Sequence, residues 1–130
     1  MFGQKKKFKL SSIASVVLIL GLAASGIVAW SQGKAVTVEG YVIDSACSFT
    51  KGLEKPISRE CALACAKAGS QLVIQTNDGV IYWPIDEKTP ANGQNAKLLE
   101  YAGGRVKATG KLYDRGGSHA LVIEKLEAAK

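Results

Sequence analysis

The chain has few of the residues that most enzyme motifs require. Its 130 residues include one histidine, three cysteines and two tryptophans, with no HExxH pair, no GxSxG nucleophile elbow and no phosphate-binding glycine loop. The CxxC pair of thioredoxin-like proteins is also missing. No two carboxylates have the spacing of an acid–base pair. These absences argue against a hydrolase, a nucleotide-dependent enzyme or a thioredoxin-like oxidoreductase, and they favour a noncatalytic protein.

Charged residues are absent between Leu10 and Trp30, a run that follows four lysines at positions 5, 6, 7 and 9. A positive segment followed by a hydrophobic one is typical of a signal peptide or a signal anchor. The run is about as long as the roughly 18 apolar residues that span a bilayer, and Trp30 suits the membrane interface. We therefore favour an uncleaved anchor over cleavage after Ala29 or Ser31. No cysteine directly follows the run, which excludes a lipoprotein anchor.

We divide the chain into a cytoplasmic Lys-rich n-region with a signal anchor or signal peptide (1–31) and an exported domain (32–130). The expected location is the inner membrane with the C-terminal domain periplasmic or extracellular, or secretion after cleavage. The exported part has 13 basic and 11 acidic residues, so the net charge of +6 comes mainly from the leader. A nucleic-acid partner is therefore not supported. We expect the membrane as a partner of the leader, and an envelope protein or a small ligand as the partner of the domain.

The exported domain shows the patterns of five strands and two short helices. Alternating apolar residues predict strands over 36–44, 71–76, 80–85, 105–113 and 118–126, with the last four forming two hairpins. Ser58 is a good N-cap for a helix over 59–68, which Gly69 can end in the left-handed conformation. A second helix is predicted over 94–102. Between the first strand and Ser58 we expect a loop.

This order of elements is that of a small five-stranded OB-like barrel, with an extra helix between the first two strands. The segments VEGYVID and GRVKATGKLYDRGGSHALVIEKLE resemble the first and closing strands of such barrels, in which a glycine helps the sheet turn its corner. The predicted fold class is therefore mainly β (β+α). In overall plan the chain also resembles the periplasmic haem chaperone of cytochrome c maturation. The haem-attaching histidine of that protein has no counterpart after the last strand, so its function does not carry over.

The pattern D-x-x-C followed by C-A-x-x-C-A-K-x-G is similar to that of small exported bacterial proteins of unknown function. In that group a histidine often stands shortly before the second cysteine. Ser58, Arg59 and Glu60 occupy this space here. The resemblance therefore supports the fold and the export of the chain, and it does not imply a shared metal site.

The three cysteines, Cys47, Cys61 and Cys65, carry the functional question. On one helix Cys61 and Cys65 would have Cβ atoms about 5–6 Å apart, which exceeds the roughly 3.5–4.5 Å of a disulfide. A bridge from Cys47 to either of them is feasible in an oxidising compartment and would stabilise the domain by about 3 kcal/mol. We favour this bridge, with the third thiol packed as a small apolar residue beside Ala64 and Ala68.

Two other roles for the cysteines remain open. Three thiolates, or two with His119, form a donor set suited to Cu(I) or Zn. Thiol redox chemistry is the other role, because Cys61 would lie near a helix N-terminus, which lowers the pKa of a thiol. The function we expect is a membrane-anchored or secreted noncatalytic binding or accessory module of the bacterial cell envelope that requires no cofactor. The alternative is a soft-metal or thiol-redox protein that uses Cys47, Cys61 and Cys65.

Overall fold

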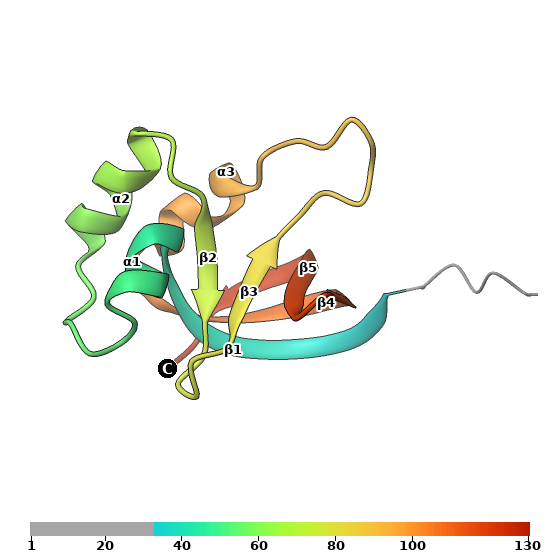
Figure 1. Ribbon diagram of the computed structural model, residues 1–130, viewed down its shortest axis with the longest axis horizontal. Helices are drawn as coiled ribbons and strands as arrows, with labels where there is room; N and C mark the ends of the chain where they lie inside the picture. The colour runs from blue at the N-terminus through green and yellow to red at the C-terminus, as the bar shows by residue number, and fades with distance from the viewer. Residues whose placement is uncertain (1–32) are drawn as a thin grey trace, which may run out of the picture.

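The computed structural model describes residues 33–130, which form a closed barrel of five strands (Figure 1). The strands are β1 (Lys34–Asp44), β2 (Leu72–Gln75), β3 (Ile81–Pro84), β4 (Arg105–Arg115) and β5 (Ser118–Ala128). Around the barrel they follow the order β1-β2-β3-β5-β4, and β4 pairs with β1 to close it. The predicted OB-like, mainly β fold is confirmed. The predicted leader lies outside the described residues.

Closure of the barrel depends on one parallel contact. Every neighbouring pair of strands is antiparallel except β3 and β5, where Trp83 stands opposite Ala120. Pro84 is the last residue of β3, which fits its lack of a backbone N–H for a longer ladder. Both predicted hairpins form, and the first turns at Gly79 with a φ of +87°. The local sequence indicates these hairpins, whereas the parallel contact joins segments that are distant in the chain.

The barrel core is made of aliphatic side chains from alternate strand positions. Leu98 is 0% exposed and belongs to the helical segment before β4, so one residue of the barrel core does not come from a strand. Burial of such a side chain stabilises a fold by about 1.5–3 kcal/mol. The buried core residues are Val38, Val42, Leu72, Ile74, Leu98, Val106, Ala108, Leu121 and Ile123.

Gly110 turns the corner of the closing hairpin, as the sequence predicts. The register between β4 and β5 shifts between Thr109 and Gly110, which is the sign of a β-bulge. A Cβ atom on Gly110 would lie 1.9 Å from the carbonyl oxygen of Val122. Only glycine therefore allows the two backbones to approach this closely.

The helices agree with the sequence in part. The first predicted helix is α2 (Arg59–Lys67), and Gly69 follows it with a φ of +99°. The second is shorter than expected and consists of α3 (Asn95–Leu98) and the 3-10 turn η1 (Leu99–Tyr101). A further helix, α1 (Ser45–Thr50), occupies the start of the expected loop. Figure 1 shows α1 and α2 on the same flank of the barrel, where β1 ends and β2 begins.

Candidate functional site

Asp44, the last residue of β1, lies at the centre of the cysteine-bearing insertion. Its Oδ2 accepts a hydrogen bond of 3.1 Å from the backbone N–H of Cys47 and one of 3.5 Å from Oγ of Ser70. Asp44 is thereby the N-cap of α1, a role for which aspartate is strongly preferred. The residue is only 2% exposed. A charged side chain this deeply buried is uncommon in a small domain.

A buried side-chain contact holds α1 against β2. Ser48 is the buried residue of α1, and its Oγ donates a hydrogen bond of 2.8 Å to Oε1 of Gln75. Cys47 precedes Ser48 on the same short helix and is half-buried. The register of α1 on the barrel therefore fixes where the Cys47 thiol lies.

Capping and tethering fix α2 in a similar way. The Oγ of Ser58 accepts a hydrogen bond of 3.3 Å from the backbone N–H of Cys61, which makes Ser58 the predicted N-cap. The Arg59 guanidinium donates 2.9 Å and 3.3 Å hydrogen bonds to the backbone carbonyls of Glu100 and Ala102. The start of α2 is thus attached to the segment before β4.

The face that α2 presents to the barrel differs from the predicted one. Ala62 is 3% exposed and Ala66 packs against the core, whereas Ala64 and Ala68 are exposed. The expectation that a thiol packs beside Ala64 and Ala68 is therefore wrong. Because α2 is rotated to bury Ala62, its two cysteines lie at the margin of the buried face and stay half-buried.

The three cysteines lie around the Asp44 carboxylate. Cys47 on α1 and Cys65 on α2 are both close enough to Asp44 to lower the pKa of its carboxyl group. Cys61 stands one helical turn before Cys65 on α2 and lines a small cavity together with Asp44 and Cys47. Sequence reasoning had not included Asp44 in the site, although an aspartate three residues before Cys47 is a recognisable N-cap pattern.

A small cavity of about 30 Å³ opens between α1 and α2 beside this group. Asp44, Cys47 and Cys61 line it, together with Lys51 and Lys55. A space of this size accommodates a water molecule or an ion. The cavity thus places two thiols, a carboxylate and two cationic side chains around one small volume.

The pKa of the Asp44 carboxyl group and the pKa values of two neighbouring thiols are shifted in opposite directions. Burial raises the pKa of Asp44, but hydrogen bonds from the Cys47 backbone and from the side chains of Cys47, Cys65 and Ser70 outweigh it, so the pKa is lowered. The pKa of Cys47 is raised, first by its hydrogen bond to Asp44 and then by burial. Burial, followed by the charge of Asp44, raises the pKa of Cys65. At neutral pH the carboxylate is charged and these two thiols keep their protons.

The structure does not bring His119 to the cysteines. His119 stands opposite Asp114 on β4, and its Nδ1 lies 2.5 Å from Oδ1 of that residue. This pair lies beyond Leu112, which stands opposite Lys34 at the start of β1. The cysteines follow the other end of β1. The His119 ring instead lies 5.6 Å, between centroids, from the ring of Tyr82.

The cysteines are not joined to one another in this structure. All three are free thiols, so the favoured bridge from Cys47 is not present. Within residues 33–130, no group of three or more histidine, cysteine, aspartate or glutamate side chains is arranged so that it could hold a metal ion. Asp44, Cys47 and Cys61, which line the cavity, would have to move closer together to share an ion or form a bond.

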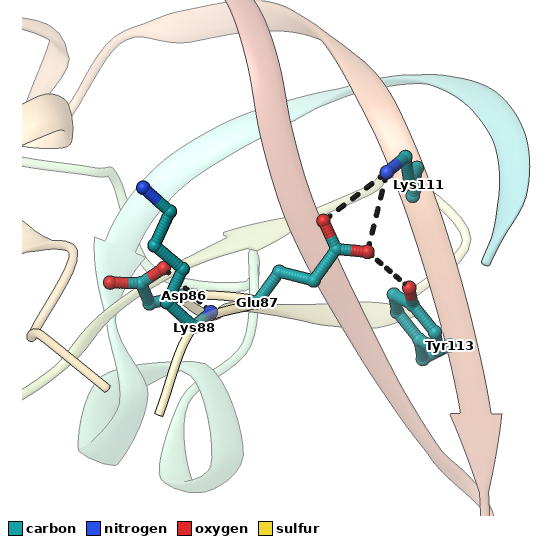
Figure 2. A network of polar contacts seen from close by, with 5 residues as sticks. All are labelled: Asp86, Glu87, Lys88, Lys111 and Tyr113. Carbon is teal, nitrogen blue, oxygen red and sulfur yellow. Dashed lines mark hydrogen bonds and ion pairs between the residues drawn. The ribbon is translucent and has the colours of Figure 1, made fainter. Parts of the chain in front are cut away.

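A second polar cluster lies where the loop after β3 meets β4 (Figure 2). The Glu87 carboxylate accepts hydrogen bonds of 3.2 Å and 3.3 Å from Nζ of Lys111 and one of 2.5 Å from Oη of Tyr113. Asp86 accepts hydrogen bonds from the backbone N–H groups of Lys88 and Asn92 within the loop. Each carboxylate thus helps to hold the loop in place.

Two further results concern the whole chain. Among the described residues, no helix combines the length and the apolar character needed to cross a bilayer. Comparison of the chain with known protein families, with curated proteins and with solved structures found no match.

Proposed function

We propose that this chain is a noncatalytic binding module of the bacterial cell envelope, and that its cysteine cluster binds a soft metal ion. The module would be exported, and either anchored through the N-terminal segment or released after cleavage. The observation that carries the proposal is that Cys47 and Cys61 line one small cavity with Asp44, and that Cys65 stands one helical turn from Cys61. Thiolates are the protein ligands preferred by Cu(I), and they also bind Zn.

The raised thiol pKa values favour binding over catalysis. A catalytic or redox-active cysteine usually has a lowered pKa, because the thiolate is the nucleophile. Cys47 and Cys65 have raised values instead. Metal binding is compatible with a raised pKa, since the ion displaces the thiol protons as it binds.

The test uses the full chain, purified in detergent and fully reduced under argon. Cu(I) and Zn affinities are measured by competition with a chromophoric chelator, for the wild type and for Cys47→Ser, Cys61→Ser and Cys65→Ser. We expect one ion per chain and a loss of affinity in each variant. His119→Ala is the matched control and should bind as the wild type does, because His119 lies at the other end of β1. Absence of both ions from protein that titrates as three free thiols would refute the proposal.

A second candidate is an accessory module whose cysteines serve only stability, with an envelope protein or a small ligand as the partner. The observation in its favour is that Cys47 and Cys61 line the same cavity, whereas Cys65 does not line it. A bridge would then join Cys47 to Cys61 and clip α1 to α2. Peptide mapping of protein taken from the envelope without reduction tests this candidate. A single free thiol at Cys65 supports it, and three free thiols contradict it.

A further inference from the structure

Phe49 on α1 is the most exposed large hydrophobic side chain within residues 33–130, at 68%. The centroid of its ring lies 6.0 Å from that of Trp83 on β3, with 34° between the ring planes. Tyr82 packs against the barrel core, so the next residue, Trp83, faces outward from the sheet. A phenyl ring that remains this exposed adds little to the stability of the core, and its face is available to a ligand.

Phe49 lines an open hollow of about 530 Å³ beside α1. The turn after α1 contributes Lys51 and Glu54 to its lining, and the turn between β2 and β3 contributes Asn77 and Asp78. That second turn is at the lower end of β2 and β3 in Figure 1. Sites for small molecules have volumes of about 300–1,000 Å³ and combine apolar or aromatic walls with a few polar groups. The hollow has this size and this mixed lining.

A buried amide gives the hollow a fixed hydrogen-bond donor. Gln75 also lines the hollow and is 5% exposed. Its Oε1 accepts the 2.8 Å hydrogen bond from Ser48, which orients the amide and leaves the nitrogen as its donor end. A Cβ atom added to Gly52, another lining residue, would lie 3.7 Å from this Nε2. Glycine at this position therefore leaves the approach to the amide nitrogen open.

From these features we infer that the hollow beside Phe49 is a binding site for an uncharged oligosaccharide. A sugar ring has a C–H face that packs against an aromatic ring, and hydroxyl groups at its edge that hydrogen-bond to polar side chains. Phe49 provides the aromatic ring, and Gln75, Asn77 and Asp78 provide hydrogen-bond donors and acceptors. An acetamido group on the sugar would offer a carbonyl oxygen to the Gln75 amide.

The charges of the lining favour a sugar over a nucleic acid. Lys51 is the one cationic side chain in this lining, whereas Glu54 and Asp78 are both anionic. Single-stranded nucleic acids are held in positively charged grooves, so they do not suit this hollow. An extended peptide commonly adds to a free sheet edge, and the barrel of residues 33–130 is closed. A neutral ligand with many hydroxyl groups requires neither a positive groove nor an edge.

The hollow is distinct from the cysteine cavity, so the inference goes beyond the proposed function. The two linings have only Lys51 and Gly52 in common, and no cysteine lines the hollow. Oligosaccharide binding is therefore measured on reduced, metal-free protein. The full chain is purified in a detergent without a sugar headgroup, because such a headgroup would compete for the site.

The experiment titrates the chain by calorimetry with a β-1,4-linked N-acetylglucosamine tetrasaccharide and with cellotetraose. We expect the first to bind more tightly. Phe49→Leu keeps an apolar side chain but removes the flat ring, and it should lower the affinity about tenfold. Phe49→Tyr retains the ring and should stay within a factor of about three. Leu99→Ala is the matched control, because Leu99 is exposed on η1 and does not line the hollow.

Each outcome bears on the inference alone. Binding that Phe49→Leu weakens and Phe49→Tyr preserves supports it. Equal affinities of wild type and Phe49→Leu would overturn it, as would failure of both oligosaccharides to bind or binding of a thymidine octanucleotide in their place. None of these results changes the metal affinities. Should Phe49→Leu fail to fold, saturation-transfer NMR of the wild type decides: transfer from aromatic protons to the sugar ring protons supports the inference, and its absence contradicts it.

Discussion

Ser48 on α1 and Gln75 at the end of β2 form a buried hydrogen bond of 2.8 Å between Oγ and Oε1, and the two side chains are 4% and 5% exposed. This contact joins the cysteine insertion to the barrel sheet. It is also a contact between two polar groups that would each be costly to bury alone. Together with the Asp44 cap, this contact therefore fixes the position of α1 and of Cys47.

Replacing Ser48 with alanine should destabilise the fold by about 1–3 kcal/mol, because Oε1 of Gln75 would be left buried without its donor. Urea unfolding of the reduced protein measures this change. Thr50→Ala is the control on the same helix, since the hydroxyl of Thr50 bonds the Ala46 carbonyl at an exposed position. Its effect should stay within about 0.5 kcal/mol. Equal effects of the two substitutions would mean that the buried contact does not hold α1.

Among the glycines of residues 33–130 that lack a positive φ, Gly110 should be the one at which alanine destabilises the barrel most. The added Cβ would lie 1.9 Å from the Val122 carbonyl oxygen, so β4 and β5 would have to separate. Such overpacking typically costs about 1–3 kcal/mol and sometimes more. Gly93→Ala is the matched control, because nothing lies within 4 Å of its added Cβ. Thermal unfolding of both variants should show a large loss for the first and almost none for the second.

Local patterns in the sequence were sufficient for most of the barrel. Val38 and Val42 alternate as strands require, Gly79 ends a recognisable turn, and Ser58 caps α2 as predicted. These features depend on residues close to one another in the chain. The parallel contact between β3 and β5 joins distant segments, and the order of strands and helices predicted it only through the fold class.

The site was less predictable because it depends on tertiary contacts. α1 has only six residues, so its stability comes from the Asp44 cap and the Ser48 contact rather than from its own sequence. That packing brings Cys47 on α1 and Cys65 on α2 close to Asp44. His119 was grouped with the cysteines only because histidine can bind metal ions. The register of β5 places it opposite Asp114, away from the end of β1 that the cysteines follow. Residue types can nominate ligands, but only the fold decides which of them meet.

The thiols of Cys47 and Cys65 should become reactive only at high pH. Both thiols have a pKa raised above the ordinary cysteine value of 9.0, so the folded state favours the protonated thiol. Their alkylation by iodoacetamide, followed by mass spectrometry of each peptide, should rise at a higher pH in folded protein than in urea-unfolded protein. In Asp44→Asn the profile of Cys47 should move toward lower pH, because the hydrogen bond to Asp44 is its main cause. An unchanged Cys47 profile in Asp44→Asn would contradict the contact between Cys47 and Asp44.

Glu87 should titrate below the usual pKa of a glutamate. Hydrogen bonds from Tyr113 and then Lys111 lower its pKa from the ordinary glutamate value of 4.5. The cluster of Figure 2 is therefore favoured above pH 4.5 and is lost as the pH falls through the folded pKa. NMR titration of the side-chain carboxyl measures the value. Tyr113→Phe removes the main cause and should raise the midpoint toward 4.5. An unchanged midpoint would show that the Tyr113 hydroxyl does not stabilise the charged form of Glu87.

Asp44 gives the domain a pH dependence of stability with a definite sign. Its pKa is lowered on folding from the ordinary aspartate value of 3.8, because hydrogen bonds to the carboxylate outweigh the opposing effect of burial. The stabilisation is therefore present above the unfolded pKa and is lost as the pH falls through the folded value. Asp44→Asn lacks the stabilisation that the charged carboxylate provides. The difference in unfolding free energy between wild type and variant should therefore be larger at pH 7 than at pH 3. Urea unfolding of reduced, metal-free protein at the two pH values measures the difference. If it were the same at both, the charge on Asp44 would add nothing to stability, and the side chain would act only as a neutral cap of α1.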